Sequence, residues 1–224
     1  MKYDLTSKMI APLLWSIAAI AILGIMVSAH AEATVRTIQK DLPAEESKWL
    51  FIELPIGDLK VIGIDGDEIR LSLKIQCEDR GRSKCRRAAE DIELDVDQHS
   101  DGIEIGIDRW PKFRNKGMSL DGYLEVPRQL VLEIDIGVGE VNVSGMEDDV
   151  EIDIGVGEAS IEMDESVVRS VSLDAGVGEA ILRVGGRTIE GSGFIGHGLD
   201  WRDGPGRAHI EVDCGVGSVD VYLE

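Results

Sequence analysis

The chain has 224 residues, with 43 acidic against 23 basic side chains and a net charge of −20 at pH 7. A strongly acidic surface repels the phosphates of DNA and RNA, so the composition excludes a nucleic-acid-binding protein. Only 4% of the residues are aromatic, whereas 26 are glycine. We therefore expect tight corners and turns and no aromatic-lined substrate cleft.

The first 31 residues have the pattern of a targeting segment. Lys2 and Lys8 give a positively charged start, residues 9–27 form an apolar stretch, and Ala29-His30-Ala31 is a small-x-small cleavage site. Two outcomes fit this pattern: removal by signal peptidase near Ala31, or retention as a membrane anchor. Both predict an exported protein, in the periplasm or at the cell surface.

After the predicted signal helix, residues 32–47 are expected to form a short N-terminal extension. Residues 48–224 are expected to form a single elongated β domain, because no linker rich in Pro, Gly or Ser interrupts them. Within this domain, we predict irregular coils over residues 48–128 and regular Gly-Val-Gly repeats over residues 129–224.

Alternating apolar and polar residues predict strands in the irregular part. Residues 50–56 alternate into a Gly-Asp pair, and residues 69–77 form a second alternating run. Residues 92–96 are predicted to pair with residues 103–107 across a Ser-Asp-Gly turn. Residues 83–90 are compatible with one helical turn, and no other segment of the domain has a helical pattern.

The most informative feature is a recurring glycine motif. Its copies are Gly137-Val138-Gly139-Glu140, Gly155-Val156-Gly157-Glu158, Gly176-Val177-Gly178-Glu179 and Gly215-Val216-Gly217-Ser218, with a worn copy at Gly196-His197-Gly198-Leu199. The first glycines lie 18, 21, 20 and 19 residues apart along the chain. A period near twenty residues predicts one supersecondary unit stacked on copies of itself.

In each unit the apolar residues of the alternating pattern shift from one set of alternate positions to the other at the glycines. In the first copy Ile134 and Ile136 lie on even positions, which Val138 is expected to continue, whereas Val141 and Val143 lie on odd positions. An inserted residue at a glycine corner explains the change, because glycine tolerates the required dihedral angles. The sequence thus predicts an all-β fold, a β-solenoid or roll of stacked two-strand repeats of about 20 residues. The last strand, residues 219–223, would leave an open edge for a partner strand.

Acidic residues recur at fixed positions in these units. In a parallel stack they are expected to form two outward files, with Asp213 rejoining the first file after the worn copy. The first file holds Asp135, Asp153, Asp174 and Asp213, and the second holds Glu140, Glu158 and Glu179. Calcium, which takes carboxylate oxygens, is one candidate ligand. The other interpretation is a salt-screened surface that discourages edge pairing.

Basic residues gather in two loops, residues 80–87 and 109–116. The candidate contacts with anionic lipid or lipopolysaccharide are Arg82, Lys84, Arg86, Arg87, Trp110, Lys112 and Arg114. The alternative is that both loops are solvated or lean on the acidic surface of the same molecule.

The cysteines agree with export. Cys77 and Cys85 flank one of the basic loops, and they are predicted either to form a disulfide or to remain two free thiols. Cys214 occupies the position that Ile136 and Ile154 hold in other repeats, so it is expected to be a buried apolar residue.

The sequence predicts no enzyme. No histidine has a Ser or Cys partner at motif spacing, and no nucleophile elbow, zinc-protease motif or phosphate loop occurs. The glycine repeats are not a dinucleotide fingerprint, because a strand follows them where that fingerprint needs a helix. No catalytic or cofactor-binding residue is therefore predicted.

The unit from Leu132 to Val143, repeated behind a signal segment and a strand beginning at Trp49, resembles the bacterial "putative adhesin" or toast-rack family of envelope β-repeat proteins. The resemblance covers about residues 48–224. It implies an exported, non-enzymatic structural or interaction module of the cell envelope, in adhesion or envelope-stress signalling. The basic loop between Cys77 and Cys85 and the worn copy at residues 194–201 depart from the pattern. The alternative function is a ligand-binding module for calcium or anionic lipid, and the sequence leaves the protein or cell-surface partner and the oligomeric state open.

Overall fold

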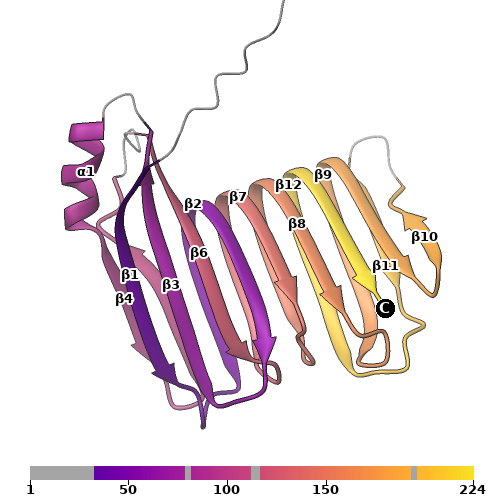
Figure 1. Ribbon diagram of the computed structural model, residues 1–224. Coiled ribbons are helices and arrows are strands. Elements are labelled where there is room, and N and C mark those ends of the chain that lie inside the picture. The colour runs from indigo at the N-terminus through magenta and orange to yellow at the C-terminus, as the bar shows by residue number, and fades with distance from the viewer. Residues whose placement is uncertain (1–32, 79–81, 112–116, 193–195) are drawn as a thin grey trace, which may run out of the picture. The chain divides into compact units, whose positions relative to one another are not determined.

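The computed structural model describes residues 33–78, 82–111, 117–192 and 196–224. These residues form a 12-stranded sheet with one α-helix at its N-terminal end (Figure 1). The predicted all-β class is therefore confirmed, while the predicted signal segment lies outside the described residues. No helix in the described part of the chain is long and apolar enough to cross a membrane.

The elements follow one another in a simple order. They are β1 (Ala33–Pro43), β2 (Trp49–Ile64), β3 (Glu68–Cys77), α1 (Arg82–Asp91), β4 (Glu93–Gln98), β5 (Gly102–Asp108), β6 (Met118–Pro127), β7 (Val131–Ser144), β8 (Val150–Met163), β9 (Val168–Val184), β10 (Arg187–Glu190), β11 (His197–Trp201) and β12 (Ala208–Leu223).

Five long strands bend in the middle and lie side by side in the order β2-β7-β8-β12-β9. We call these strands the bent-strand array; Figure 1 shows their curved course across the sheet. All neighbours in the array are parallel and in register. In β7 the residues Ile134 and Ile136 are buried before the bend, and Val141 and Val143 are buried after it. These buried positions change from even to odd residue numbers at the bend. The two limbs of each strand, before and after the bend, therefore face the same aliphatic core.

The order of the array differs from the predicted succession of repeats. The last strand, β12, lies between β8 and β9, with Val212 opposite Ile152 on one side and Leu173 on the other. The prediction that residues 219–223 form an open edge is therefore wrong. Near-identical units can pair in register with any copy, so the repeat pattern favours stacking without specifying its order.

The worn copy of the motif does not form a parallel rung. Instead β11 pairs antiparallel with the first limb of β9, with Leu199 opposite Leu173. The short strand β10 pairs antiparallel with the second limb, with Ile189 opposite Leu182. Leu199 is buried, so this segment lengthens the core beyond β9 without repeating the corner.

At the other end of the array, the two limbs of β2 also take different neighbours. Ile52 on the first limb lies opposite Ile105 of β5, and Val61 on the second limb lies opposite Leu124 of β6. The predicted pairing of residues 92–96 with 103–107 is confirmed, because Val96 of β4 lies opposite Ile105. The sheet continues antiparallel from β6 to β3 and β1, so part of the expected N-terminal extension is a strand.

The helix α1 is longer than the single turn expected over residues 83–90. It buries Cys85, Ala88 and Ala89, and it packs against β1 and β3. Its last turn is capped by Arg36 of β1, whose Nη1 donates hydrogen bonds to the carbonyl oxygens of Ala89 (2.9 Å), Glu90 (3.1 Å) and Ile92 (2.6 Å). A cation at this place satisfies carbonyls that have no partner within the helix.

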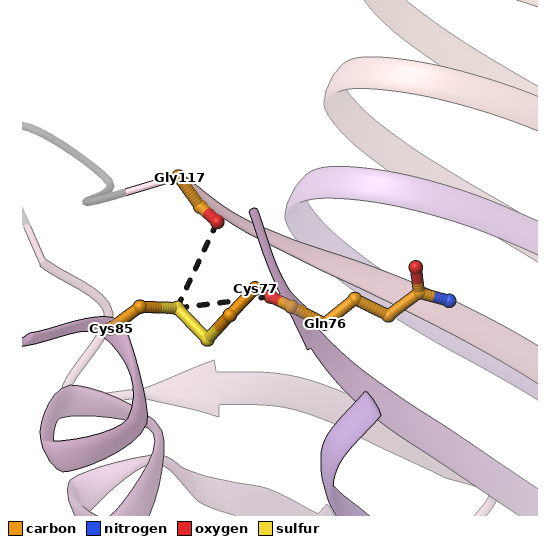
Figure 2. Close-up of a disulfide and its surroundings, with 4 residues drawn as sticks. All are labelled: Gln76, Cys77, Cys85 and Gly117. Carbon is orange, nitrogen blue, oxygen red and sulfur yellow. Dashed lines mark hydrogen bonds between the residues drawn. A yellow bond between two sulfur atoms is a disulfide. The ribbon is translucent and has the colours of Figure 1, made fainter. Parts of the chain in front are cut away.

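A disulfide joins Cys77, the last residue of β3, to Cys85 in α1 (Figure 2). Both residues are fully buried. The Sγ atom of Cys85 lies 3.9 Å from the carbonyl oxygen of Gln76 and 3.8 Å from that of Gly117. The bond therefore ties the helix to the end of the sheet at a point where β3 and β6 lie side by side.

Candidate contact surface at the glycine corners

The second glycine of each motif makes the bend possible. Gly157 has a φ of +154°, and a Cβ atom on it would lie 1.7 Å from the carbonyl oxygen of Gly139 on the neighbouring strand. Gly139, Gly178 and Gly217 show the same conformation and the same close approach. Only glycine adopts this φ with so little space, so these positions hold the corners of adjacent strands in contact.

The bend leaves one branched apolar side chain outside the core on every strand. We call this file the corner ridge; from β2 to β9 it consists of Ile56, Val138, Val156, Val216 and Val177. Val138 is 45% exposed, Val156 48%, Val216 46% and Val177 59%. The prediction that Val138 continues the buried even face is wrong, because the chain already turns outward at Gly137.

The acidic residues two positions before the corner motif form an outward file. We call it the aspartate file; in spatial order it consists of Glu53, Asp135, Asp153, Asp213 and Asp174. Asp213 lies between Asp153 and Asp174, and does not follow them as the sequence analysis expected. Glu53 extends the file onto β2, a strand without the glycine motif, and was therefore missed.

A second acidic file follows the corner on the other side of the ridge. We call it the glutamate file; it consists of Glu140, Glu158 and Glu179. Ser218 of β12 lies between Glu158 and Glu179 and interrupts it. At the β2 end, the side chain of Asp58 accepts a hydrogen bond of 3.2 Å from the backbone N–H of Glu140. The ridge is thus flanked by carboxylates on both sides.

A shallow hollow of about 390 Å³ lies along the aspartate file, at the first glycines of the corners. Asp135, Asp153, Asp213 and Asp174 line it, and glycines 155, 176 and 215 contribute no side chain to its floor. The hollow is therefore lined by carboxylates and glycines.

Two of these carboxyl groups, Asp153 and Asp213, have a raised pKa. Partial burial, and then the charges of Asp135 and Glu211, raise the pKa of Asp153. Partial burial, and then Asp153, Glu211 and Asp174, raise the pKa of Asp213. Among the described residues, no Lys or Arg forms an ion pair with a member of either file.

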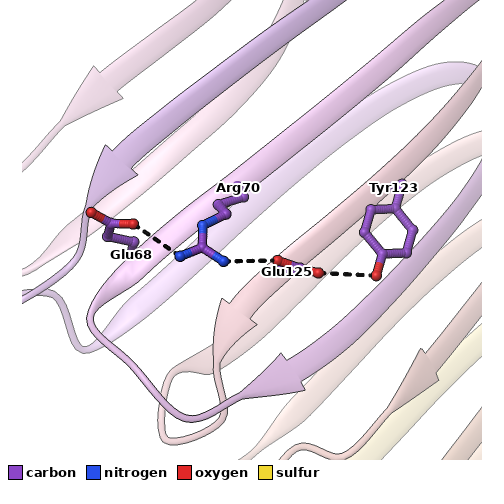
Figure 3. Close-up of polar contacts among 4 residues, drawn as sticks. All are labelled: Glu68, Arg70, Tyr123 and Glu125. Atoms are coloured by element: carbon purple, nitrogen blue, oxygen red, sulfur yellow. Dashed lines mark hydrogen bonds and ion pairs between the residues drawn. The ribbon is translucent and has the colours of Figure 1, made fainter.

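The outer face of β3 and β6 shows the opposite arrangement. Arg70 lies 3.2 Å from Glu68 and 3.3 Å from Glu125, whose other oxygen accepts a hydrogen bond of 3.1 Å from the hydroxyl of Tyr123 (Figure 3). The bond to Glu125 raises the pKa of Tyr123. Charges on this face are paired, whereas those beside the ridge are not.

The acid files do not gather into a metal site. In the described part of the chain, no group of three or more His, Cys, Asp or Glu residues has an arrangement that could hold a metal ion. Neighbours within a file come from successive strands and point outward in a row, while a calcium site needs six or more oxygens that converge on one point. Calcium binding stays a prediction.

The predicted lipid contacts are only partly described. Lys84, Arg86 and Arg87 are exposed on α1, whereas Trp110 is half-buried and packs against the core. An aromatic ring held by the core has less surface free for membrane insertion. The side chain of Arg82 and residues 112–116, which include Lys112 and Arg114, lie outside the described residues.

The structure also brings together a pair that the sequence analysis missed. The hydroxyl of Ser170 lies 2.9 Å from Nδ1 of His209, whose Nε2 lies 3.5 Å from a carboxylate oxygen of Glu211. A nucleophile, a base and a carboxylate in this order occur in hydrolases. However, Ser170 is only 8% exposed, which leaves its hydroxyl little contact with solvent. Ser170 and His209 meet because β12 lies beside β9, with His209 opposite Ser170. The order of the repeats along the chain does not predict this neighbour.

Comparisons with known proteins show that this chain shares its fold with a solved structure. No protein-family model matches the sequence, and the search of curated proteins finds no relative. The structure is similar to that of a "putative cell adhesion protein" from Clostridium sporogenes, with a TM-score of 0.50 and 16% identity. The match covers 84% of this chain and 99% of the other.

Two further solved structures overlap more loosely. A "putative lipid binding protein" from Parabacteroides distasonis gives a TM-score of 0.33 at 10% identity, over 83% of this chain and 62% of the other. A "putative adhesin" from Bacteroides fragilis gives 0.30 at 12% identity, over 83% and 97%. Identities this low show a shared fold alone, and of these three structures the Clostridium protein overlaps closely enough to support that statement.

Proposed function

We propose that this chain is an exported, non-enzymatic interaction module of the bacterial cell envelope, adhesin-like in the sense that it works by surface contact. The observation that carries the proposal is the corner surface: four adjacent in-register strands present exposed valines, and the carboxylates on both sides of them have no Lys or Arg ion-pair partner among the described residues. Exposed apolar patches rimmed by polar residues typically mark interaction sites.

Three observations support export. The first 31 residues have the pattern of a targeting segment. Cys77 and Cys85 form a disulfide, a bond that persists in oxidising compartments and is rare in the cytosol. The fold is similar to that of a protein described as a "putative cell adhesion protein".

The export part is tested by expressing the full chain in a bacterial host and fractionating the cells. We expect the protein in the periplasmic or surface fraction, with an N-terminus after Ala31 or an intact segment held in the membrane. Thiol labelling of the unfolded protein should find Cys214 free and the other two cysteines oxidised. A cytosolic protein with an intact N-terminus and three free thiols would contradict the proposal.

The contact part is tested with fluorescently labelled protein and isolated cell envelopes. We expect saturable binding that an excess of unlabelled protein displaces. Binding that rises linearly without saturation would contradict a contact function.

The ligand-binding alternatives need separate experiments. Calorimetry with calcium should give heat and a raised melting temperature if the acid files take the ion. Flotation with anionic liposomes, repeated in high salt, tests the exposed bases Lys84, Arg86 and Arg87. A positive result in either experiment would favour that alternative over contact at the ridge.

A further inference from the structure

We propose that the corner ridge and the two acid files beside it dock a basic amphipathic α-helix of a partner protein. The apolar stripe of this helix would pack on the ridge, and its Lys and Arg side chains would reach the aspartate file on one side and the glutamate file on the other. The inference rests on the proposed contact function and specifies its partner.

The apolar part of the argument comes from exposure. The large hydrophobic side chains that are exposed in the described residues are Tyr123 and the four valines of the ridge. The valines come from four adjacent strands and lie opposite one another in the ladder. One continuous apolar file on a chain that otherwise buries its aliphatic residues is a contact surface for another apolar stripe.

The charge part of the argument concerns both flanks of the ridge. Each flank carries carboxylates that have no Lys or Arg ion-pair partner among the described residues. A partner with basic residues on both sides of its apolar stripe would neutralise both flanks. A second copy of this chain docking through the same surface would set carboxylates against carboxylates, so face-to-face self-association is disfavoured.

The geometry favours a helix over a strand as the partner. The array strands β7, β8 and β12 each have a paired neighbour on both sides, so their backbone groups are not free to accept an added strand. The partner must therefore contact side chains. Neighbouring strands of the array, and therefore neighbouring side chains of the ridge, lie about 4.8 Å apart. This spacing is close to the 5.4 Å pitch of a partner helix, whereas residues on one face of a partner strand would repeat at about 6.8 Å. The ridge crosses five strands, which makes four strand spacings or about 19 Å, and this length corresponds to a helix of about 13 residues.

The test uses a synthetic 18-residue helical peptide with one leucine stripe flanked on both sides by lysines. Its binding to protein purified after expression of the full chain is followed by fluorescence anisotropy. We expect saturable one-to-one binding that weakens about tenfold in the double variant Val156→Ser/Val216→Ser, because two half-exposed valines lose their apolar contact. The double variant Asp153→Asn/Asp213→Asn should also weaken binding, and added salt should reduce the difference.

Matched variants elsewhere on the protein serve as controls. Tyr123→Ser removes the exposed aromatic side chain outside the ridge, and Asp95→Asn/Asp97→Asn removes two exposed carboxylates of β4. Both should bind the peptide as tightly as the parent protein. All substituted side chains lie on the surface, and circular dichroism and melting curves verify that each variant is folded.

Two peptide controls decide between docking and simple charge attraction. A leucine–glutamate helix should not bind, and a glycine–serine–lysine peptide of equal charge should bind at least about tenfold more weakly. Equal binding of the peptide without leucines, an unchanged affinity in Val156→Ser/Val216→Ser, or an equal loss in the control variants would overturn the inference. If the peptide fails to bind while saturable envelope binding persists, the helix inference fails and the proposed function stands.

Discussion

The bent-strand array and the N-terminal strands β1, β3 and β6 share one sheet but arrange their outward charges differently. In β3 and β6 the antiparallel pairing sets Lys74 opposite Asp121, with 3.0 Å between Nζ and the carboxylate. In the array, parallel pairing of repeated units sets Asp153 opposite Asp135 and Asp213. Parallel in-register stacking of a repeat therefore places identical side chains next to one another. Inside the sheet, contacts between isoleucines stabilise the fold, whereas outside it, repulsion between carboxylates costs free energy.

The two regions also differ in what holds them together. The array depends on close backbone contact at the glycine corners. The N-terminal part depends on a disulfide and on a helix whose last turn is capped by Arg36. Substitutions that remove each of these features test the comparison.

The largest effect is expected at a corner. Gly157→Ala would place a Cβ atom 1.7 Å from the carbonyl oxygen of Gly139, at a φ of +154°. We expect a loss of about 3 kcal/mol or more in the free energy of unfolding, measured in urea. In the N-terminal part, Gly106→Ala meets nothing within 4 Å and should change stability by less than about 0.5 kcal/mol. Equal losses in the two variants would refute the role of the corner.

The disulfide is expected to have the next largest effect. The variant Cys77→Ala/Cys85→Ala opens a loop with a sequence separation of 8 residues, and should lose about 2–3 kcal/mol. A reducing agent should destabilise the parent protein by a similar amount and leave the variant unchanged. A reductant effect that persists in the variant would show that another bond is responsible.

The cap of α1 is expected to contribute less. Arg36→Met removes the donor to three carbonyl oxygens at the end of the helix, and should cost about 1–3 kcal/mol. Lys40→Met on the same strand removes an exposed cation and serves as the control. Thermal melts of both variants give the comparison, and similar melting temperatures would argue against the cap.

The smallest effect concerns the charges, and here the two regions should respond with opposite signs. Asp153→Asn relieves repulsion and should stabilise the protein by about 0.5–1 kcal/mol at pH 7. Asp121→Asn removes a partner of Lys74 and Gln76 and should not stabilise it. A loss of stability in Asp153→Asn would mean that the file has an unrecognised cationic partner.

The pH dependence of this effect follows from the raised pKa of Asp153. Folding raises the pKa of this carboxyl group, so its contribution to the free energy of unfolding is most favourable below the pKa of the unfolded state. That contribution is lost as the pH rises through the pKa of the folded state. The advantage of Asp153→Asn should therefore be present at neutral pH and disappear as the pH falls below about 4, the usual range of an aspartate.

Much of the fold could be predicted from the sequence because its signals are local. Alternation identified the buried faces, and the parity change located the bend at Gly139. The pair Cys77 and Cys85 could be singled out from its spacing, although only the structure shows the helix that brings Cys85 to β3. The cap by Arg36 could not be found, since it joins residues more than 50 positions apart.

The acidic residues of the candidate surface could largely be predicted, but the order of the strands that carry them could not. The repeated acids were recognised, yet the position of Asp213 and the pairing of Ser170 with His209 depend on the strand order. The exposure of Val138 was missed because alternation assumes an unbent strand. Near-identical units are interchangeable in register, so only long-range packing selects the order β8-β12-β9.

The most direct test of the account is cross-linking of cysteines across the array, in a Cys214→Ala background. Adjacent parallel strands place Cα atoms about 4.8 Å apart, within reach of a disulfide, whereas strands two apart are about 9.6 Å apart and out of reach. Because Ser218 pairs with both Glu158 and Glu179, we predict that Ser218→Cys forms a disulfide with Glu158→Cys and with Glu179→Cys in the respective double variants, detected by mass spectrometry of unreduced digests. Efficient bonding of Glu158→Cys to Glu179→Cys, without bonding to Ser218→Cys, would contradict the strand order and the continuous surface built on it.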